Sequence, residues 1–275
     1  MERSLRATGC TLPLKVIPFD ESRFSLPGDA QWWEMPEVCK WLSSRGAHPF
    51  LRRYQCLLVA NVHYVDSDII FLRDPAVELA PHSGFVVCCG HWRNVTHATT
   101  PAVERSLRTK SLLWQYLVFN AGQFACDRAL YTFENLKSLC ESAEWSETIL
   151  GNRFHDQPGT NIVVNLSGVS ITNLTLPPTL LQSSWAGDYQ SEADLEWLKG
   201  NHAPYLLHWA GIPRHTQLPV DKLVLQFLSQ SERREWESEI RESRERSLRV
   251  TRGPFSMVSR LKRAVQAGLN SLRSE

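Results

Sequence analysis

Short apolar segments alternate with stretches of helical periodicity along the first 210 residues, and this alternation limits the folds open to the chain. We expect strands at residues 14–19, 62–65, 85–89, 118–126, 170–174 and 205–208. We expect helices at residues 49–60, at the start of 102–117, at 129–150, and from a cap at Asp156 to about residue 165. Such alternation is typical of an α/β domain, a mixed sheet flanked by helices.

The pattern changes after Pro219. Residues 221–249 carry Glu and Arg at spacings of three and four, which predicts a solvated helix with weak ion pairs. Gly253 and Pro254 end it, and residues 255–273 form a further candidate helix with one apolar side. That helix either packs on the α/β domain or lies on an anionic membrane surface as a peripheral contact. The sequence therefore divides into an α/β domain at 1–219 and a C-terminal helical extension at 220–275.

Composition excludes several classes of protein. A net charge of +1 over 275 residues argues against nucleic acid as a partner, because phosphate backbones attract concentrated basic surfaces. The sequence has no run of about 18 apolar residues and no apolar signal-peptide core near Met1. Its seven cysteines are odd in number and lack Cys-x-x-Cys spacing, which indicates neither a disulfide framework nor a zinc site. These features predict a cytoplasmic protein, peripheral at the membrane if residues 255–273 dock there.

Two carboxylates follow the expected strand at 62–65. Asp66 and Asp68 are one residue apart, so both can turn toward one point where the chain leaves the sheet. Ligands of open α/β sheets bind at this carboxyl edge. Paired carboxylate oxygens suit Mg²⁺ or Mn²⁺, which also bind substrate phosphates. The alternative is a solvated turn, in which Asp is common.

Three later segments give the acidic pair a context. Residues 64–75 run from a strand through Asp-x-Asp to Leu-x-Asp-Pro; residues 119–124 read Phe-Asn-Ala-Gly-Gln-Phe; residues 155–161 contain Asp-Gln and a later Asn; and residues 207–211 read Leu-His-Trp-Ala-Gly. In this order they resemble the motifs of nucleotide-sugar glycosyltransferases of the GT-A fold, in particular the glycogenin-like branch and similar bacterial enzymes. The resemblance covers about residues 4–216 and implies a Rossmann-like mixed sheet flanked by helices.

The resemblance also implies roles for individual residues. A divalent cation, Mn²⁺ or Mg²⁺, would be held by Asp66, Asp68 and His208, and the imidazole ligand favours Mn²⁺. The nucleotide-sugar donor and its metal would contact Asp66, Ser67, Asp68, Gly122 and Gly211. The sugars would be held for catalysis by Asn120, Asp156 and Gln157. Each motif also has a structural alternative: a buried histidine, a kinked strand at Asn120 and Gly122, or a helix cap at Asp156.

The implied activity is metal-dependent transfer of a sugar from a nucleoside-diphosphate sugar to a carbohydrate or glycoconjugate acceptor, with retention at the anomeric carbon. One alternative is another metal-dependent phosphate enzyme, such as a phosphatase that uses Asp66 as nucleophile. Such enzymes place Gly or Thr after the second Asp, whereas Ile69 stands here. Another alternative is a non-catalytic relative that binds sugar nucleotides.

The beginning of the chain departs from the pattern that it resembles. In GT-A enzymes a first strand and a helix precede the strand that residues 14–19 match. Here only residues 1–9 are available for those two elements. That length is too short for both elements. We therefore expect an N-terminally shortened chain without the first strand, in which residues 4–9 end an interrupted helix.

Overall fold

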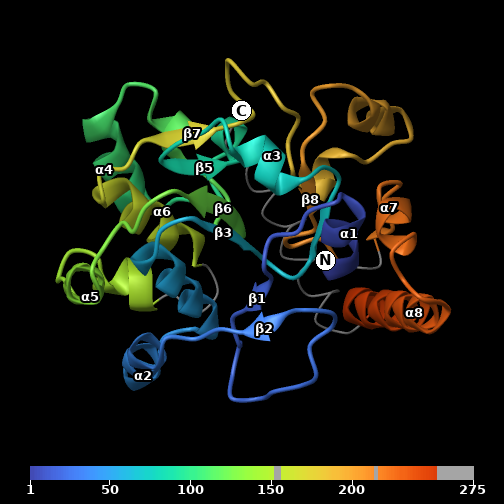
Figure 1. Cartoon of the computed structure of the whole chain (residues 1–275), viewed down its shortest axis with the longest axis horizontal. Helices are drawn as coiled ribbons and strands as arrows, with labels where there is room; N and C mark the ends of the chain where they lie inside the picture. The colour runs from blue at the N-terminus through green and yellow to red at the C-terminus, as the bar shows by residue number, and fades with distance from the viewer. Residues whose placement is uncertain (152–155, 214–215, 253–275) are drawn as a thin grey trace, which may run out of the picture. The chain divides into compact units, whose positions relative to one another are not determined.

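The computed structural model describes residues 1–151, 156–213 and 216–252, with the backbone alone for 247–252 (Figure 1). The chain forms two compact units, Met1–Ala210 and Gly211–Glu275. The first is a mixed α/β unit, and the described part of the second is helical. None of the helices in the described residues combines the length and hydrophobicity needed to span a lipid bilayer.

The largest sheet of the first unit has four strands in the order β3 (Val62–Val65), β6 (Gln123–Cys126), β5 (Phe85–Val87) and β7 (Ile171–Asn173). The β3–β6 and β6–β5 pairs are antiparallel, and β5–β7 is parallel. Among the described strands, β3 pairs only with β6 and so forms an edge of this sheet. The strand predicted at 62–65 is confirmed over that range, and those predicted at 85–89, 118–126 and 170–174 are confirmed over shorter ranges.

One face of this sheet packs against helices. Strand side chains alternate between the two faces, and Tyr64, Phe85 and Phe124 share the helical face. Their rings stack, with centroids 5.2 Å apart for Tyr64 and Phe124 and 4.9 Å for Phe85 and Phe124. The helices that contribute to this core include α2 (Pro36–Ser44), the 3₁₀ segment η1 (Pro49–Leu58), α4 (Pro101–Lys110), α5 (Phe133–Cys140) and α6 (Gln157–Leu166).

The other face supports a second, two-stranded sheet. Here β4 (Ile69–Phe71) pairs antiparallel with β8 (Leu206–His208), with Ile69 opposite His208. Their apolar side chains join Val86 and Ala125 of the large sheet in a second core. Helix α1 (Glu2–Ala7) lies against β4, where Ser4 Oγ accepts a hydrogen bond from the Phe71 amide at 3.1 Å. This pairing brings the residue after Asp68 opposite His208, 139 positions later in the chain.

Several predicted elements differ from the structure. The expected strand at 14–19 is only β1 (Lys15–Val16), which pairs in parallel with β2 (Gln31–Trp32), so three small sheets replace one continuous sheet. The helix predicted at the start of 102–117 is confirmed as α4, and η3 (Trp114–Leu117) follows it. The helix predicted over 129–150 is instead α5 followed by the π-helical η4 (Glu147–Gly151). The strand β4 was not predicted. The remaining short helices are α3 (Pro75–Leu79), η2 (His91–Arg93), η5 (Ala186–Asp188) and η6 (Ala193–Lys199).

The second unit contains α7 (Asp221–Leu225) and α8 (Gln230–Arg252). The helix predicted at 221–249 is therefore confirmed in two pieces, interrupted at residues 226–229. The candidate helix at 255–273, with its peripheral membrane contact, lies outside the described residues.

Candidate metal centre

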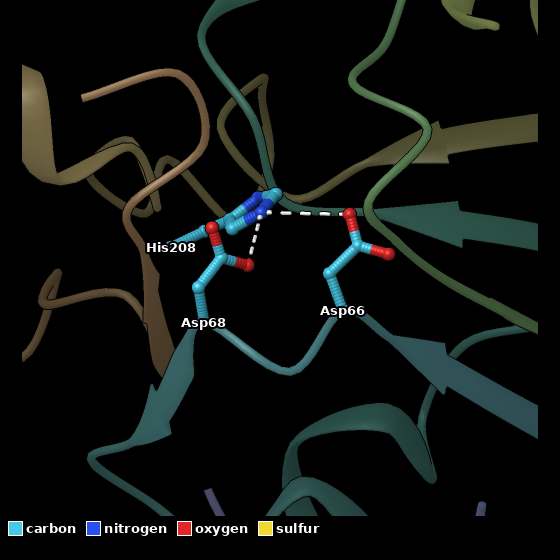
Figure 2. Close-up of side chains that lie close together, drawn as sticks. All are labelled: Asp66, Asp68 and His208. Atoms are coloured by element: carbon cyan, nitrogen blue, oxygen red, sulfur yellow. Dashed lines mark ion pairs between the residues drawn. The ribbon is translucent and has the colours of Figure 1, made fainter. Parts of the chain in front are cut away.

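The acidic pair lies in the turn between two strands that belong to different sheets. β3 ends where the Asp66 amide donates a hydrogen bond to the Gly122 carbonyl at 2.8 Å. Ser67 and Asp68 form an exposed turn, and β4 begins at Ile69. Figure 2 shows both carboxylates directed toward the imidazole of His208, which arrives from β8.

Asp66, Asp68 and His208 each place one potential ligand atom within 4.8 Å of the others. His208 Nε2 lies 3.1 Å from Asp68 Oδ1 and 3.7 Å from Asp66 Oδ2 (Figure 2). Exposure rises across the group, from 3% for the His208 side chain to 28% for Asp66 and 48% for Asp68. A group buried on one side and open on the other can hold a ligand that solvent and substrate still reach.

The chemistry of these three residues fits a divalent cation. His208 Nε2 is buried, and the groups that face it among the described residues are the carboxylates of Asp68 and Asp66, at 3.1 and 3.7 Å. Metal–ligand bonds of about 2.1 Å place neighbouring ligand atoms about 3.0 Å apart at right angles and about 3.5 Å apart at wider angles. The two separations at His208 fall close to these values. Two carboxylates and an imidazole could therefore share Mn²⁺, and two hard oxygens would also accept Mg²⁺.

Gly122 makes room for this group. A Cβ on Gly122 would lie 2.2 Å from His208 Cε1 and 2.5 Å from Asp66 Oδ2, well inside van der Waals contact. The turn before it is closed by Asn120, whose Oδ1 accepts a hydrogen bond from the Gly122 amide at 2.7 Å. The structure thus places both Asn120 and Gly122 beside the carboxylates, and Asn120 shapes the turn; its catalytic role stays a prediction.

Arg53 connects the metal centre to Asp156. Arginine beside an apolar stripe is usually solvated, but Arg52 and Arg53 are both buried in η1. Arg53 Nη2 lies 2.9 Å from Asp156 Oδ2 and 3.7 Å from Asp66 Oδ1. A buried guanidinium is tolerated because it finds carboxylates and carbonyls as partners.

Asp156 stands at the N-terminus of α6 without capping it. Its side chain makes no hydrogen bond to the first turn, so the predicted side-chain cap is wrong. The carboxylate is turned to Arg53 instead. Gln157 begins α6, and its Oε1 is buried without a hydrogen-bond partner in the described residues. An unpaired amide oxygen beside a carboxylate could accept a hydrogen bond from a hydroxyl group.

Helix α6 is fastened to the segment that carries Asn120. Asn161 accepts a hydrogen bond from the Phe119 amide at 3.0 Å and donates one to the Phe119 carbonyl at 2.8 Å. Asn165 Nδ2 donates to the Leu117 carbonyl at 3.2 Å. The Asn of the Asp-Gln…Asn element therefore joins α6 to the turn at Asn120 and Gly122.

Burial and charge act in opposite directions on Asp66. Burial raises the pKa of its carboxyl group, and the Arg53 guanidinium offsets part of that rise. Tyr64 donates a hydrogen bond to Asp66 Oδ1 at 2.6 Å and further favours the ionised form. Our sequence reasoning missed Tyr64, although its position two residues before Asp66 on one strand was a usable signal.

The loop at residues 90–101 carries His91 and Trp92. Burial lowers the pKa of His91 to about 4, and the charges of His208 and His97 lower it further. Trp92 fixes the loop by donating from Nε1 to Thr175 Oγ1 at 2.9 Å. His91 was not singled out from the sequence.

Ser67 and Gly211, the other two residues predicted to contact the donor, lie in different parts of the chain. Ser67 is exposed in the turn between the carboxylates. Gly211 has a φ of 69°, which favours glycine, and it opens the second unit. The structure brings together Asp66, Asp68, His208, Gly122 and Asn120. Arg53 connects Asp156 to this group, and Gln157 follows Asp156 at the start of α6.

Comparisons of the chain with protein-family models, with curated proteins and with solved structures find no match in any of the three.

Proposed function

We propose that this chain is a metal-dependent glycosyltransferase of GT-A type. It would transfer a sugar from a nucleoside-diphosphate sugar to a carbohydrate or glycoconjugate acceptor, with Mn²⁺ or Mg²⁺ as cofactor. The proposal joins the motif resemblance to the geometry of the first unit.

The observation that carries the proposal is the convergence of Asp66, Asp68 and His208, with ligand atoms within 4.8 Å of one another. The two carboxylates are separated by one residue in the sequence, whereas His208 reaches them through the β4–β8 pairing. Arg53 connects this group to Asp156, because its Nη2 lies 3.7 Å from Asp66 Oδ1 and 2.9 Å from Asp156 Oδ2. A donor that bridges a metal and a sugar-binding carboxylate needs such a pair of neighbouring sites.

The chemistry follows from where charge develops during transfer. As the bond between the anomeric carbon and the diphosphate oxygen breaks, negative charge accumulates on the departing diphosphate. A divalent cation bound at this centre would supply Lewis-acid stabilisation of that charge. Asp66, Asp68 and His208 hold the binding position, and Gly122 keeps it unobstructed.

The residues at the start of α6 suit the sugar. Asp156 offers a carboxylate, and Gln157 offers an amide oxygen that has no hydrogen-bond partner among the described residues; both can accept hydrogen bonds from hydroxyl groups. We assign them to donor-sugar binding, together with Asn120. The glycogenin-like pattern implies retention, which NMR of the product anomer would test.

A thermal-shift screen is the first experiment. The full chain is heated with Mn²⁺ and UDP-, GDP-, CMP- or dTDP-sugars, because a ligand that binds the folded state raises the midpoint with its concentration. The expected result is a shift with one nucleotide class that requires the metal, together with slow metal-dependent hydrolysis of that sugar nucleotide. Binding without hydrolysis or transfer would indicate a non-catalytic relative. Release of phosphate from p-nitrophenyl phosphate, without any sugar-nucleotide effect, would favour the phosphatase alternative.

A further inference from the structure

The Arg53 side chain contacts four groups around the metal centre. Its Nε donates to the Phe50 carbonyl at 3.0 Å and Nη1 donates to the Ala121 carbonyl at 2.7 Å. Nη2 faces Asp156 at 2.9 Å and Asp66 at 3.7 Å. Only 4% of the side chain is exposed, so these contacts fix the guanidinium from several directions.

The contacts separate the two oxygens of Asp66. Oδ1 receives the Tyr64 hydroxyl at 2.6 Å and faces Arg53, whereas Oδ2 faces His208. A carboxylate held by one oxygen presents the other in a defined direction, as partners behind a metal ligand commonly do. The contact with the Ala121 carbonyl holds the guanidinium at the residue that precedes Gly122.

We propose that Arg53 is a positioning residue: it holds Asp66 with Oδ2 toward the cation position and holds Asp156 at the start of α6, so that one guanidinium sets the geometry of both. The inference rests on the proposed metal centre. Arg53 carries one positive charge, and its two carboxylate partners, Asp66 and Asp156, carry two negative charges when ionised. The three side chains then have a net negative charge, which attracts a cation. The planar fork of Arg serves several partners at fixed angles, which the ammonium group of Lys cannot reproduce.

Arg52 provides a matched control. It is the neighbouring residue of η1 and is also buried, with 8% of its side chain exposed. Its partners lie elsewhere, namely Glu21 at 2.8 Å and the carbonyls of Pro18 and Asp20 at 3.0 and 3.2 Å. Replacing Arg52 removes a buried guanidinium without touching Asp66 or Asp156.

The experiment measures Mn²⁺ affinity of the full chain by titration calorimetry and by electron paramagnetic resonance of free Mn²⁺, with the metal alone as ligand. The variants are Arg53→Met, Arg53→Lys and Arg52→Met, each checked by near-UV circular dichroism. Loss of a partner that orients a metal ligand typically weakens affinity about 10- to 100-fold. We expect that loss for Arg53→Met, a smaller loss for Arg53→Lys, and affinity within about twofold of wild type for Arg52→Met.

The outcomes separate this inference from the proposed function. No Mn²⁺ binding by the wild-type chain would remove the metal centre itself. Wild-type binding that is unchanged in folded Arg53→Met would overturn the role of Arg53 alone, as would an equal loss in Arg52→Met. If Arg53→Met does not fold, Arg53→Lys is the deciding variant. Wild-type Mn²⁺ affinity in Arg53→Lys would contradict the proposal, because a positive charge without the planar guanidinium would then be enough to position Asp66.

Discussion

The backbone of Gly122 lies so close to His208 that a Cβ there would stand 2.2 Å from Cε1 of the imidazole. The same Cβ would stand 2.5 Å from Asp66 Oδ2. Gly122 therefore leaves open the space in which these two candidate ligands approach each other. Its φ lies outside the left-handed region, so the backbone itself permits alanine at this position.

Gly122→Ala should thus act through the ligands. The added methyl group must displace the imidazole or the carboxylate, and we expect Mn²⁺ affinity to fall about 10- to 100-fold. The control is Gly200→Ala, because a Cβ at Gly200 meets nothing within 4 Å. Calorimetric titration of both variants checks the prediction, and equal affinities in the two would show that the space at Gly122 is unimportant.

Asp156→Asn should separate turnover from nucleotide binding. The amide keeps the size of the side chain but removes the charge that faces Arg53 at 2.9 Å. Breaking a buried ion pair on one side costs on the order of 3 kcal/mol, so the free energy of unfolding should fall by roughly that amount. Turnover should fall far more than affinity for the nucleoside diphosphate, measured by steady-state kinetics and calorimetry. Parallel loss of both would indicate that Asp156 acts only on the fold.

His63 should make stability depend on pH. Burial lowers its pKa to about 4, and its Nε2 lies 3.2 Å from the Tyr205 hydroxyl. An unfolded histidine has a pKa of about 6.5, so between about pH 6.5 and 4 the unfolded state binds more protons than the folded state. The free energy of unfolding should therefore decrease as pH falls through this window, by on the order of 2 to 3 kcal/mol from this residue.

The check is urea unfolding of wild type and His63→Gln at pH 7 and pH 4.5. Glutamine stays uncharged, so the variant should lose less stability on acidification than the wild type. An equal loss in both proteins would mean that His63 is not held in its neutral form by the fold.

Local patterns predicted the strands β3 and β8 and the acidic turn, because apolar runs and turn residues report directly on nearby backbone. They did not predict that β4 pairs with β8, since a pairing across more than 130 residues leaves no periodic signal. For the same reason the sequence alone could not place His208 at the carboxylates; only the motif resemblance suggested it.

Arg53 shows a second limit. Arginine beside an apolar stripe is usually solvated, so the local pattern of residues 49–60 gives no sign that Arg53 is buried. Its burial depends on Asp66 and Asp156, which lie 13 and 103 residues further along the chain. Partners supplied by tertiary structure reverse the ordinary preference of a charged side chain for water.

The central claim is that Asp66, Asp68 and His208 together bind a divalent cation. Its most direct test is Mn²⁺ titration of the metal-free full chain, followed by calorimetry, for wild type, Asp68→Asn and His208→Ala. The account predicts one Mn²⁺ per wild-type chain and an affinity at least about 10-fold weaker in each variant. Asp68→Asn should keep the wild-type thermal midpoint, because its side chain is 48% exposed. Two results would contradict the account. One is unchanged Mn²⁺ affinity in folded Asp68→Asn and His208→Ala chains, and the other is no Mn²⁺ binding by the wild-type chain.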